Sequence, residues 1–468
     1  MEKSLRPTEL HLFSKFGSTF AFEPQRLNLF QVSPLILDIL QDADGKTPDE
    51  LAALLAPRYD PMKIKENIRK LRGAGILKDN NGNAPGQVNI PIAPKNEKSG
   101  IDRIVLFSSH SCNLRCKYCF NDAVESPEEK HMPFEIARAA VDFLLEHMEE
   151  KTQANILFYG GEPLLNFDCI KETARYADEK ARQWGKKFAY SIATNGILLT
   201  DAIIDFLVDH GFAIGLSLDG GRQVHDANRV FPGGAGSYAK VVENFKKLTA
   251  KKADVTIQAV IGSSGLDIRQ ALADLRAVGA INYRFINRSL ADGDVECASG
   301  FNVFKENYDS MIAAQLKEDG QKGLPSIPLN FYSLFQQIEE RDIVRNSCVG
   351  GSNQAAISAD GNIWPCENCL GQPRFAMGNV KTGFDTAIIS SLTAIGIETV
   401  PECAACWARF LCGGPCPQVS LQKHNKLAEP VETVCAAKRH FMETGLAAYA
   451  YYKSGNKNFM KNWSTRRS

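Results

Sequence analysis

Ser111-Cys-Asn-Leu-Arg-Cys-Lys-Tyr-Cys-Phe120 places three cysteines in the spacing C-x-x-x-C-x-x-C, just after an apolar run at 104–107 that is typical of a strand. Three thiolates in one short loop are able to hold three corners of a [4Fe–4S] cluster. The fourth iron then has no protein ligand and is open to another molecule. A zinc loop on Cys112, Cys116 and Cys119, completed by a distant His or Cys, is the alternative.

Strand and helix patterns alternate from this loop onward. Helical stretches at 134–148, 169–183 and 202–209 separate several of the strand candidates. This alternation predicts an α/β fold with a parallel sheet, as an open or partial barrel whose chemistry lies at the carboxyl ends of the strands. The strand candidates are residues 104–107, 155–158, 189–193, 213–218, 255–260 and 283–286.

Three short motifs fall at the predicted strand ends. They are Tyr159-Gly-Gly-Glu-Pro163, Thr194-Asn-Gly196 and Ser217-Leu-Asp-Gly220. Glycines allow the backbone to approach a ligand closely, so the first motif is a candidate binding loop. A plain strand-to-helix turn is the alternative for it, and turn capping is the alternative for Asn195 and Asp219.

The cysteine spacing, with the aromatic Tyr118 before the third cysteine, resembles the hallmark of the radical S-adenosylmethionine (radical SAM) superfamily. The resemblance implies a partial (β/α)6 barrel in which the cofactor's amine and carboxylate chelate the open iron. One electron then splits the cofactor into methionine and a 5′-deoxyadenosyl radical, which abstracts hydrogen from the substrate. The implied cofactor contacts are Tyr118, Gly160, Gly161, Glu162, Ser191, Asn195, Ser217, Asp219 and Arg229, the last as a cation for the carboxylate.

Cysteine is dense again between residues 348 and 435, which indicates metal or redox chemistry in a protein without a secretion signal. The spacing is similar to that of the SPASM domain, an extension of some radical SAM enzymes that holds two auxiliary [4Fe–4S] clusters. The resemblance implies one cluster on Cys348, Cys366, Cys369 and Cys416, and a second on Cys403, Cys406, Cys412 and Cys435.

Cys369 is additional to the seven-cysteine pattern, and without it one iron would stay open for a substrate thiolate. Two structural zinc sites are the alternative for the whole region. Glu367 follows a predicted ligand, at a position where relatives that oxidise protein side chains carry a base. We therefore predict Glu367 as a catalytic residue beside Cys112, Cys116 and Cys119. Cys169 and Cys297 remain as ordinary residues.

Residues 1–80 predict a winged helix, with paired strands around Gly17, a third strand at 27–32 and three short helices. Such modules commonly bind DNA, and the last helix carries Lys63, Lys65, Arg69, Lys70 and Arg72, although acidic residues interrupt this stripe. Beside a radical enzyme, the module instead resembles the element that recognises precursor peptides in ribosomal peptide maturases. Such elements add the peptide as a strand to the sheet edge, here at 27–32 and the helix from Asp60. A domain that only caps the barrel is the alternative.

The expected organisation places the winged helix at 1–80, a linker at 81–99, the radical SAM barrel at 100–300 and a helical bridge at 301–345. A SPASM domain at 346–440 and a C-terminal helix with a basic tail at 441–468 follow. The formal net charge is zero, so no global field favours nucleic acid or a membrane. Without a signal pattern or a long apolar run, we expect a cytoplasmic protein.

The motifs look closest to maturases of cysteine-rich peptides and of the small subunit of quinohemoprotein amine dehydrogenase. The resemblance implies an intrapeptide crosslink, a thioether from a Cys sulfur to carbon, in a precursor peptide or small protein subunit. It also implies S-adenosylmethionine, three [4Fe–4S] clusters and an electron donor such as flavodoxin or ferredoxin. The alternatives are a carbon–carbon crosslink, an anaerobic sulfatase-maturating (formylglycine-forming) activity, and a zinc-binding winged-helix regulator without catalysis.

Overall fold

The structure is a computed structural model that describes residues 4–79, 100–119, 130–261, 268–287, 298–322, 326–456 and 459–464. The linker predicted at 81–99 and Cys297 lie outside these residues, as do both ends of the predicted basic tail. Within the described part of the chain, no helix is long and apolar enough to cross a membrane.

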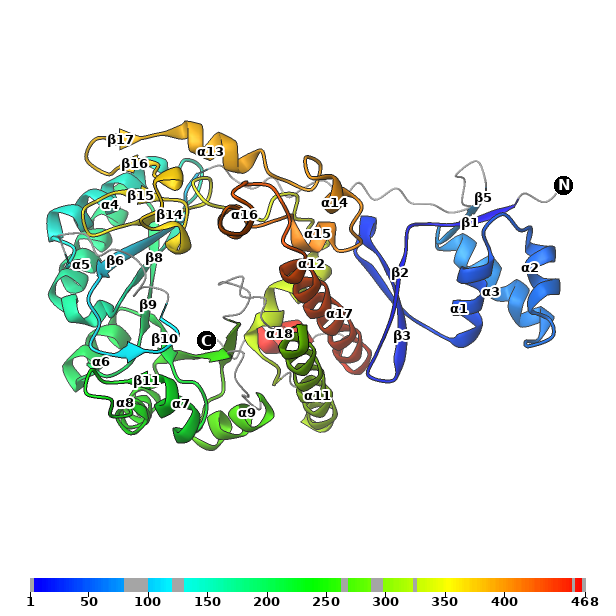
Figure 1. Cartoon of the computed structure of the whole chain (residues 1–468), viewed down its shortest axis with the longest axis horizontal. Helices are drawn as coiled ribbons and strands as arrows, with labels where there is room; N and C mark the ends of the chain where they lie inside the picture. The colour runs from blue at the N-terminus through cyan, green and yellow to red at the C-terminus, as the bar shows by residue number, and fades with distance from the viewer. Residues whose placement is uncertain are drawn as a thin grey trace.

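A curved parallel sheet lies in the left-hand part of the molecule in Figure 1. Its strands follow one another in chain order, and each pairs in parallel with the next. The six predicted strands and their parallel arrangement are confirmed. They are β6 (Arg103–Ser109), β8 (Gln153–Gly160), β9 (Lys187–Thr194), β10 (Ala213–Ser217), β12 (Asp254–Ile261) and β13 (Tyr283–Asn287).

Helices follow the strands and cover the outer side of the sheet (Figure 1). In α5 the buried positions recur at helical spacing and include Ala174, Ala177 and Ala181, whose small side chains let the helix approach the sheet closely. Gly185 ends this helix with a left-handed conformation, φ 62°. The helices are α4 (Phe134–His147), α5 (Phe167–Trp184), α6 (Asp201–Asp209), α8 (Tyr238–Ala250) and α9 (Ile268–Ala277).

Two strands from the cysteine-rich region extend the same sheet, an arrangement that the sequence did not predict. β14 (Gln354–Ile357) pairs in parallel with β6, and β15 (Ile363–Trp364) pairs antiparallel with β14. Val105 and Phe107 of β6 are buried in one apolar cluster with Trp364 of β15. The cysteine-rich region is thus joined to the barrel through backbone pairing and a shared core.

Residues 4–79 build a separate apolar core beneath a three-stranded antiparallel sheet and three helices. The helices begin at the predicted signals, because Ser33, Thr47 and Asp60 each cap a helix that starts with proline. The elements are β1 (Leu5–Pro7), β2 (His11–Lys15), β3 (Ser18–Glu23), β4 (Asn28–Val32), α1 (Pro34–Asp42), α2 (Pro48–Leu55), α3 (Pro61–Gly73) and β5 (Leu77–Asp79), which pairs with β1.

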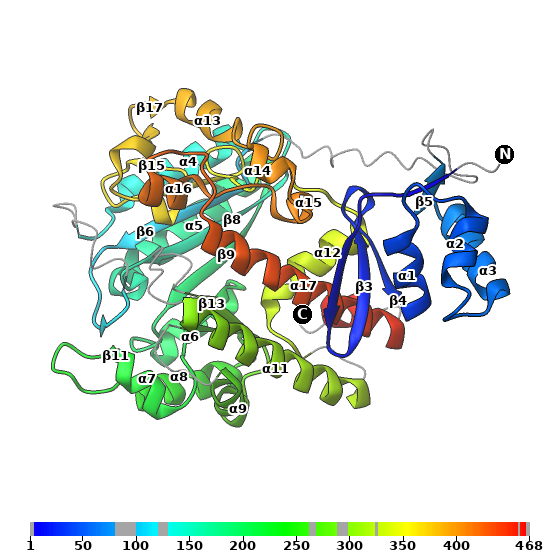
Figure 2. The same ribbon diagram turned by 45° about the vertical axis from the view of Figure 1, so that its right-hand side comes forward.

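A long helix, α17 (Glu432–Gly455), runs between this module and the barrel and packs against β2 and β4 (Figure 2). The ring of His11 stacks on Trp407 with centroids 3.8 Å apart, and Arg409 forms two hydrogen bonds with Glu9. Trp407 and Arg409 lie between the predicted ligands Cys406 and Cys412, so the N-terminal module contacts the cysteine-rich region directly.

The C-terminal end differs from the tail expected from the sequence. α18 (Phe459–Ser464) buries Phe459 and Trp463, which pack on Phe335 of α12 (Tyr332–Glu340). Two aromatic residues in a basic segment give little helical periodicity, so only the packed structure shows that this stretch belongs to the core.

Candidate active site

The first three cysteines lie in a loop directly after β6, all partly exposed. The Leu114 N–H donates to the Cys112 sulfur at 3.4 Å, and the Cys119 N–H donates to the Cys116 carbonyl. Burial raises the pKa of the Cys116 thiol to about 11, and the charges of Cys112 and Cys119 act in the same direction. The three sulfurs are therefore close enough to influence one another.

The Gly-Gly-Glu-Pro motif packs against the backbone of this loop. A Cβ on Gly160 would lie 2.1 Å from the Ser109 carbonyl oxygen, and one on Gly161 would lie 2.5 Å from that of Ser111. The Gly161 N–H donates to the Ser109 carbonyl at 2.8 Å, and the Glu162 N–H donates to the Ser111 carbonyl at 2.9 Å. These glycines therefore hold the motif against the cysteine loop.

Glu162 is fully buried and joins the ends of β8 and β9. Its carboxylate accepts hydrogen bonds from the Thr194 hydroxyl at 2.7 Å and from the N–H groups of Asn195 and Leu164. Burial raises the pKa of Glu162 to about 7, although these three donors lower it. The position of Glu162 explains the motif structurally, and its contact with the cofactor stays a prediction.

The other predicted contacts follow the same strand ends. Asn195 donates from Nδ2 to Asn113 at 2.7 Å and to the Cys112 sulfur at 3.7 Å. Ser217 is the last residue of β10. Ser191 lies deeper, within β9, and donates to Asn155 of β8 at 2.9 Å. Asn195 thus touches the cysteine loop itself, whereas Ser191 stands three residues before the end of its strand.

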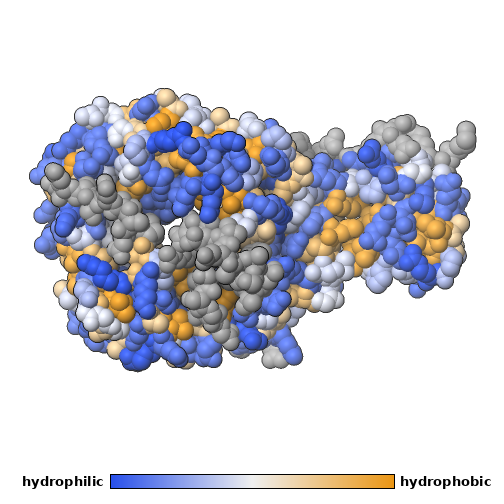
Figure 3. All heavy atoms as spheres, viewed as in Figure 1, coloured by the Kyte–Doolittle hydropathy of each residue, from blue (hydrophilic) through white to orange (hydrophobic). Residues whose placement is uncertain are grey.

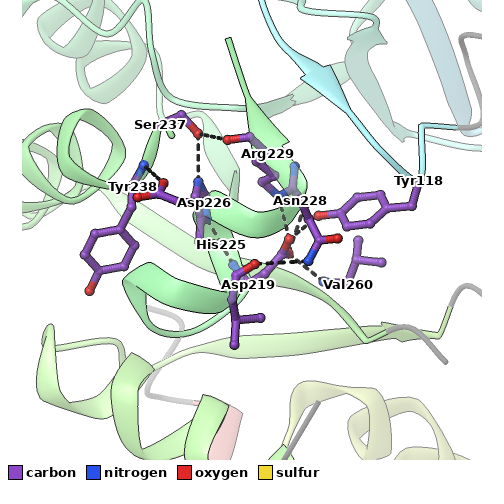
Figure 4. A network of polar contacts seen from close by, with 10 residues as sticks. Tyr118, Asp219, His225, Asp226, Asn228, Arg229, Ser237, Tyr238 and Val260 are labelled. Carbon is purple, nitrogen blue, oxygen red and sulfur yellow. Dashed lines mark hydrogen bonds and ion pairs between the residues drawn. The ribbon is translucent and has the colours of Figure 1, made fainter. Parts of the chain in front are cut away.

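Asp219 and Arg229 form a buried ion pair just beyond β10 (Figure 4). Arg229 donates from Nε and Nη2 to the two carboxylate oxygens at 2.9 and 3.1 Å. The Tyr118 hydroxyl donates to the same carboxylate, and the Tyr118 ring lies 5.4 Å from the guanidinium carbon. Arg229 is therefore engaged by a carboxylate of the chain, and its predicted contact with the cofactor carboxylate stays a prediction.

Four of the later cysteines lie together beside the barrel. The sulfurs of Cys366 and Cys369 are 3.6 Å apart, and Cys348 packs in the same apolar cluster. The hydrogen bond to Cys366, burial, and the charges of Cys366, Cys416 and Cys348 raise the pKa of the Cys369 thiol. These are the four cysteines that the resemblance implies for the first auxiliary cluster.

The other four line a cavity of about 920 Å³, and Cys416 of the first group lines it too. Burial raises the pKa of the Cys403 thiol to about 11, and the charges of Cys435, Cys412 and Cys406 raise it further. Lys438 donates to the Cys412 sulfur at 3.7 Å. This group corresponds to the second implied cluster.

Donor chemistry tests whether these groups suit iron–sulfur clusters. Thiolates are the cluster ligands, and hydrogen bonds to sulfur tune a bound cluster; Leu114, Asn195 and Lys438 supply such bonds here. The donor sets therefore fit iron–sulfur clusters, and their ligation stays a prediction.

Tyr159 is a residue of this site that the sequence reading missed. Tyr159 belongs to β8 and lies on the face of the sheet that bears the cluster around Phe107 and Trp364. Its ring lies edge-on to the ring of Phe107, with centroids 5.5 Å apart, and it packs beside Cys348 and Cys366. Burial raises its pKa, and the charges of Glu367 and Cys119 add to this effect. Tyr159 thus stands near both the cysteine loop and the predicted base. Its place directly before Gly160 was the only available signal.

Glu367 itself is half-buried. Gln354 of β14 donates to its carboxylate at 3.5 Å. The residue therefore belongs to the surface that joins the auxiliary cysteines to the barrel, and its role as a base stays a prediction.

Residues 106–274 match the family model described as the radical SAM superfamily. The match includes the cysteine loop and all three strand-end motifs. The chain is a radical SAM enzyme. As such it uses S-adenosylmethionine and a [4Fe–4S] cluster, and the alternative of a zinc-binding regulator without catalysis is excluded.

Two curated relatives of this radical SAM enzyme are sulfatase-maturating enzymes. A cysteine-type anaerobic sulfatase-maturating enzyme of Clostridium perfringens (strain 13 / Type A) is 25% identical over 370 residues, covering 72% of this chain and 94% of the relative. A serine-type enzyme of Klebsiella aerogenes is 23% identical over 324 residues, covering 66% of this chain and 77% of the relative.

Two solved structures share the fold. Native anSMEcpe with bound AdoMet has a TM-score of 0.64 at 20% identity and covers 77% of this chain and 99% of its own. Streptococcus suis SuiB bound to the precursor peptide SuiA has a TM-score of 0.51 at 15% identity and covers 92% of this chain and 100% of its own. The predicted fold class of this radical SAM enzyme is confirmed.

Proposed function

We propose that this radical SAM enzyme is a peptide maturase that forms an intrapeptide thioether between a Cys sulfur and carbon in a precursor peptide or small protein subunit. The observation that carries the proposal is the single sheet shared by both cysteine regions. β6 ends in the cysteine loop and pairs with β14 of the auxiliary region, so a substrate side chain at the strand ends would lie near both.

The bound cofactor and cluster supply a radical that removes a hydrogen atom. The chain's own residues would position the cluster and shield it from water. Cys112, Cys116 and Cys119 would hold the first cluster, and the strand-end motifs would orient S-adenosylmethionine. The implied sets of Cys348, Cys366, Cys369 and Cys416, and of Cys403, Cys406, Cys412 and Cys435, would hold two auxiliary clusters.

A thioether removes two hydrogens from the peptide. One leaves carbon as the abstracted hydrogen atom, and the other leaves the thiol as a proton. When the thiolate bonds to the carbon radical, one electron is released and passes to an acceptor. Glu367 would accept that proton, because it is half-buried near Tyr159 at the junction of barrel and auxiliary region. The external donor of the first electron would be a flavodoxin- or ferredoxin-type protein.

The peptide itself would bind at the N-terminal module. Within the described sheet β4 is an edge strand, and Phe30 on it is 37% exposed. Met62 at the start of α3 is 75% exposed, and Figure 3 shows apolar side chains gathered on one face of this module. An added peptide strand along β4, with apolar side chains toward α3, would satisfy both features.

Sulfatase maturation is the second candidate, because sulfatase-maturating enzymes are among the curated relatives. The peptide-bound SuiB structure supports action on a precursor peptide, since its likeness extends over 92% of this chain, and it does not bear on which bond forms. A carbon–carbon crosslink would use the same fold, and full ligation by Cys369 would suit it.

The cofactor assignment is tested with anaerobically purified protein. We expect roughly twelve irons per chain, four for each of three clusters, and reductant-dependent release of 5′-deoxyadenosine. The triple variant C112A/C116A/C119A should lose this release and keep the auxiliary-cluster absorbance. C169A is the matched control, because Cys169 is buried in α5 and belongs to no implied set. Release that persisted in the triple variant would refute the site assignment.

The bond is tested by co-expression with a short cysteine-rich open reading frame beside the gene. A thioether should remove two hydrogens and one alkylatable thiol per linkage, and should not react with a hydrazide. A hydrazide-reactive aldehyde would identify formylglycine instead, and a loss of two hydrogens with every thiol retained would identify a carbon–carbon bond.

A further inference from the structure

The loop that carries the first three cysteines is clamped by a segment far along the chain. β7 (Arg115–Cys116) pairs antiparallel with β11 (Arg229–Val230), and Arg229 stands opposite Cys116 in this ladder. The Lys117 N–H adds a hydrogen bond to the Asn228 carbonyl at 3.0 Å. The position of Cys116 therefore depends on where the backbone of Arg229 lies.

Asp219 fixes that position from the other side (Figure 4). Its carboxylate is fully buried and receives both donors of Arg229, the Tyr118 hydroxyl, and the Val260 N–H of β12 at 2.9 Å. One carboxylate thus connects the ends of β10 and β12 with the cysteine loop. A forked guanidinium suits this bidentate contact better than an ammonium does.

The segment between Asp219 and Arg229 is braced independently. His225 of α7 (Arg222–Asn228) is fully buried, accepts from the Asp219 N–H at 3.4 Å and lies 2.9 Å from the Ser237 hydroxyl. Ser237 in turn donates to the Arg229 carbonyl at 2.8 Å (Figure 4). The network therefore ends on the same residue that pairs with Cys116.

We infer that Asp219 and Arg229 are a positioning pair that locks the cysteine loop onto the barrel and keeps the buried charge beside Cys116 balanced. This inference rests on the proposed function, because it assumes a cluster in that loop. A reduced cluster carries one more negative charge than an oxidised one, so an uncompensated cation nearby would stabilise the reduced form and raise the midpoint potential.

The test is the midpoint potential of the cluster whose electron paramagnetic resonance signal changes on addition of S-adenosylmethionine. In D219N the Arg229 charge stays, since a guanidinium keeps its proton, and we expect a more positive potential. In D219N/R229Q both charges are gone, and the potential should return toward that of the parent protein. An unshifted D219N protein, or a shift that persists in the double variant, overturns the inference.

R229K distinguishes the effect of the positive charge at position 229 from the effect of the forked hydrogen bonds. It also provides a test if the D219N protein fails to retain the cluster. It keeps the cation but not the fork, so we expect the parent potential together with faster loss of iron to a chelator. A potential shifted as in the D219N prediction, or an unchanged rate of iron loss, overturns the positioning role. Failure of the proposed function looks different, because the parent protein would then show no signal that responds to S-adenosylmethionine.

Discussion

At the scale of single residues, buried polar groups connect the cysteine loop with the ends of the barrel strands. Glu162, Asp219 and Asn195 are all buried, and each joins two or more strand ends. A buried carboxylate is tolerated only where donors satisfy it. Their environments differ, since Asp219 faces a guanidinium and Glu162 faces only neutral donors.

Glu162 predicts a pH dependence of stability. A glutamate in an unfolded chain titrates near about 4.3, whereas burial raises the pKa of Glu162 to about 7. Its protonation therefore stabilises the folded state fully below about 4.3, and this contribution is lost as the pH rises through about 7. In E162Q the thermal unfolding midpoint should therefore depend less on pH between about pH 5 and 8 than it does in the parent protein.

The same substitution should also lower the midpoint overall, because the amide carbonyl of glutamine replaces one carboxylate oxygen, whereas its NH2 group takes the place of the other and cannot accept the Asn195 N–H. An unsatisfied buried donor costs about 1–3 kcal/mol. E172Q, on the exposed side of α5, is the matched control. An E162Q protein with the parent's pH slope would show that Glu162 does not titrate in this range.

A second residue-scale prediction concerns Gly161. Alanine there would place a Cβ 2.5 Å from the Ser111 carbonyl oxygen, so the motif or the cysteine loop must move. We expect G161A to bind S-adenosylmethionine at least about tenfold more weakly, or about 1.4 kcal/mol, in equilibrium dialysis. G73A is the control, because Gly73 has open space around it. Equal affinity in both variants would contradict the close packing.

At the scale of elements, β14 is the junction between the two cysteine regions. It continues the barrel sheet beside β6, and its four residues are all buried. Edge strands that are not covered favour association between chains, and here β14 and β15 cover β6. The strand therefore protects the barrel as well as placing the auxiliary cysteines.

Proline inside β14 should impair both of these roles. A355P removes a backbone donor from the sheet interior and should cost at least about 1–3 kcal/mol. We expect early proteolytic cleavage near residues 346–364 and a tendency to aggregate, measured by limited proteolysis and light scattering. A235P, at an exposed loop position outside this sheet, is the control. Parent-like resistance of A355P would show that β14 contributes little to holding the region.

The sequence predicted elements whose signal is local, and missed those that depend on distant partners. The strands from β6 to β13 carry continuous apolar patterns, and the caps of α1, α2 and α3 are visible as Ser, Thr or Asp before Pro. β14 reads Gln-Ala-Ala-Ile, a weak pattern that becomes a strand only because β6 offers it an edge.

The candidate site shows the same division. The resemblance carried by the cysteine spacing implied the two auxiliary groups, whose ligation stays a prediction; of these cysteines, Cys366 and Cys369 have sulfurs 3.6 Å apart. It did not indicate that Tyr159 stands near Glu367, or that Asp219 engages Arg229. Those relations arise from curvature of the sheet and from the antiparallel pairing of β7 with β11, which no local pattern encodes.

At the scale of the whole molecule, the N-terminal module rests on α17 and on the loop between Cys406 and Cys412. Lys15 forms an ion pair with Asp309 of α11 (Ala298–Lys322), and His11 pairs with Glu443 of α17. Apolar side chains of the module, including Phe13, Phe20 and Phe22, are buried in one cluster with residues of the barrel and of α17. Docking of the module therefore depends on this burial as well as on charge pairs and on the His11–Trp407 stack.

The pair Glu9–Arg409 allows a direct test of this docking. E9R should loosen the module and accelerate hydrogen exchange in β2, and E9R/R409E should restore part of the protection. Partly exposed pairs contribute about 0.2–1 kcal/mol. The hydrogen bond with Arg409 lowers the pKa of Glu9, although burial acts in the opposite direction. The stabilisation from the Glu9–Arg409 pair is therefore present above about pH 4.5 and is lost on acidification. Identical exchange in all three proteins would show that the pair does not hold the module.

The late position of β14 in the chain also bears on biosynthesis. While the ribosome makes the barrel strands, β6 has β8 on one side and nothing on the other, because its second neighbour, β14, follows all six barrel strands in the chain. Pairing between such distant segments is slow, and unpaired strand edges are prone to self-association during folding. The nascent enzyme thus stays vulnerable to aggregation until β14 has been synthesised, and chaperone supply in that interval would govern its yield.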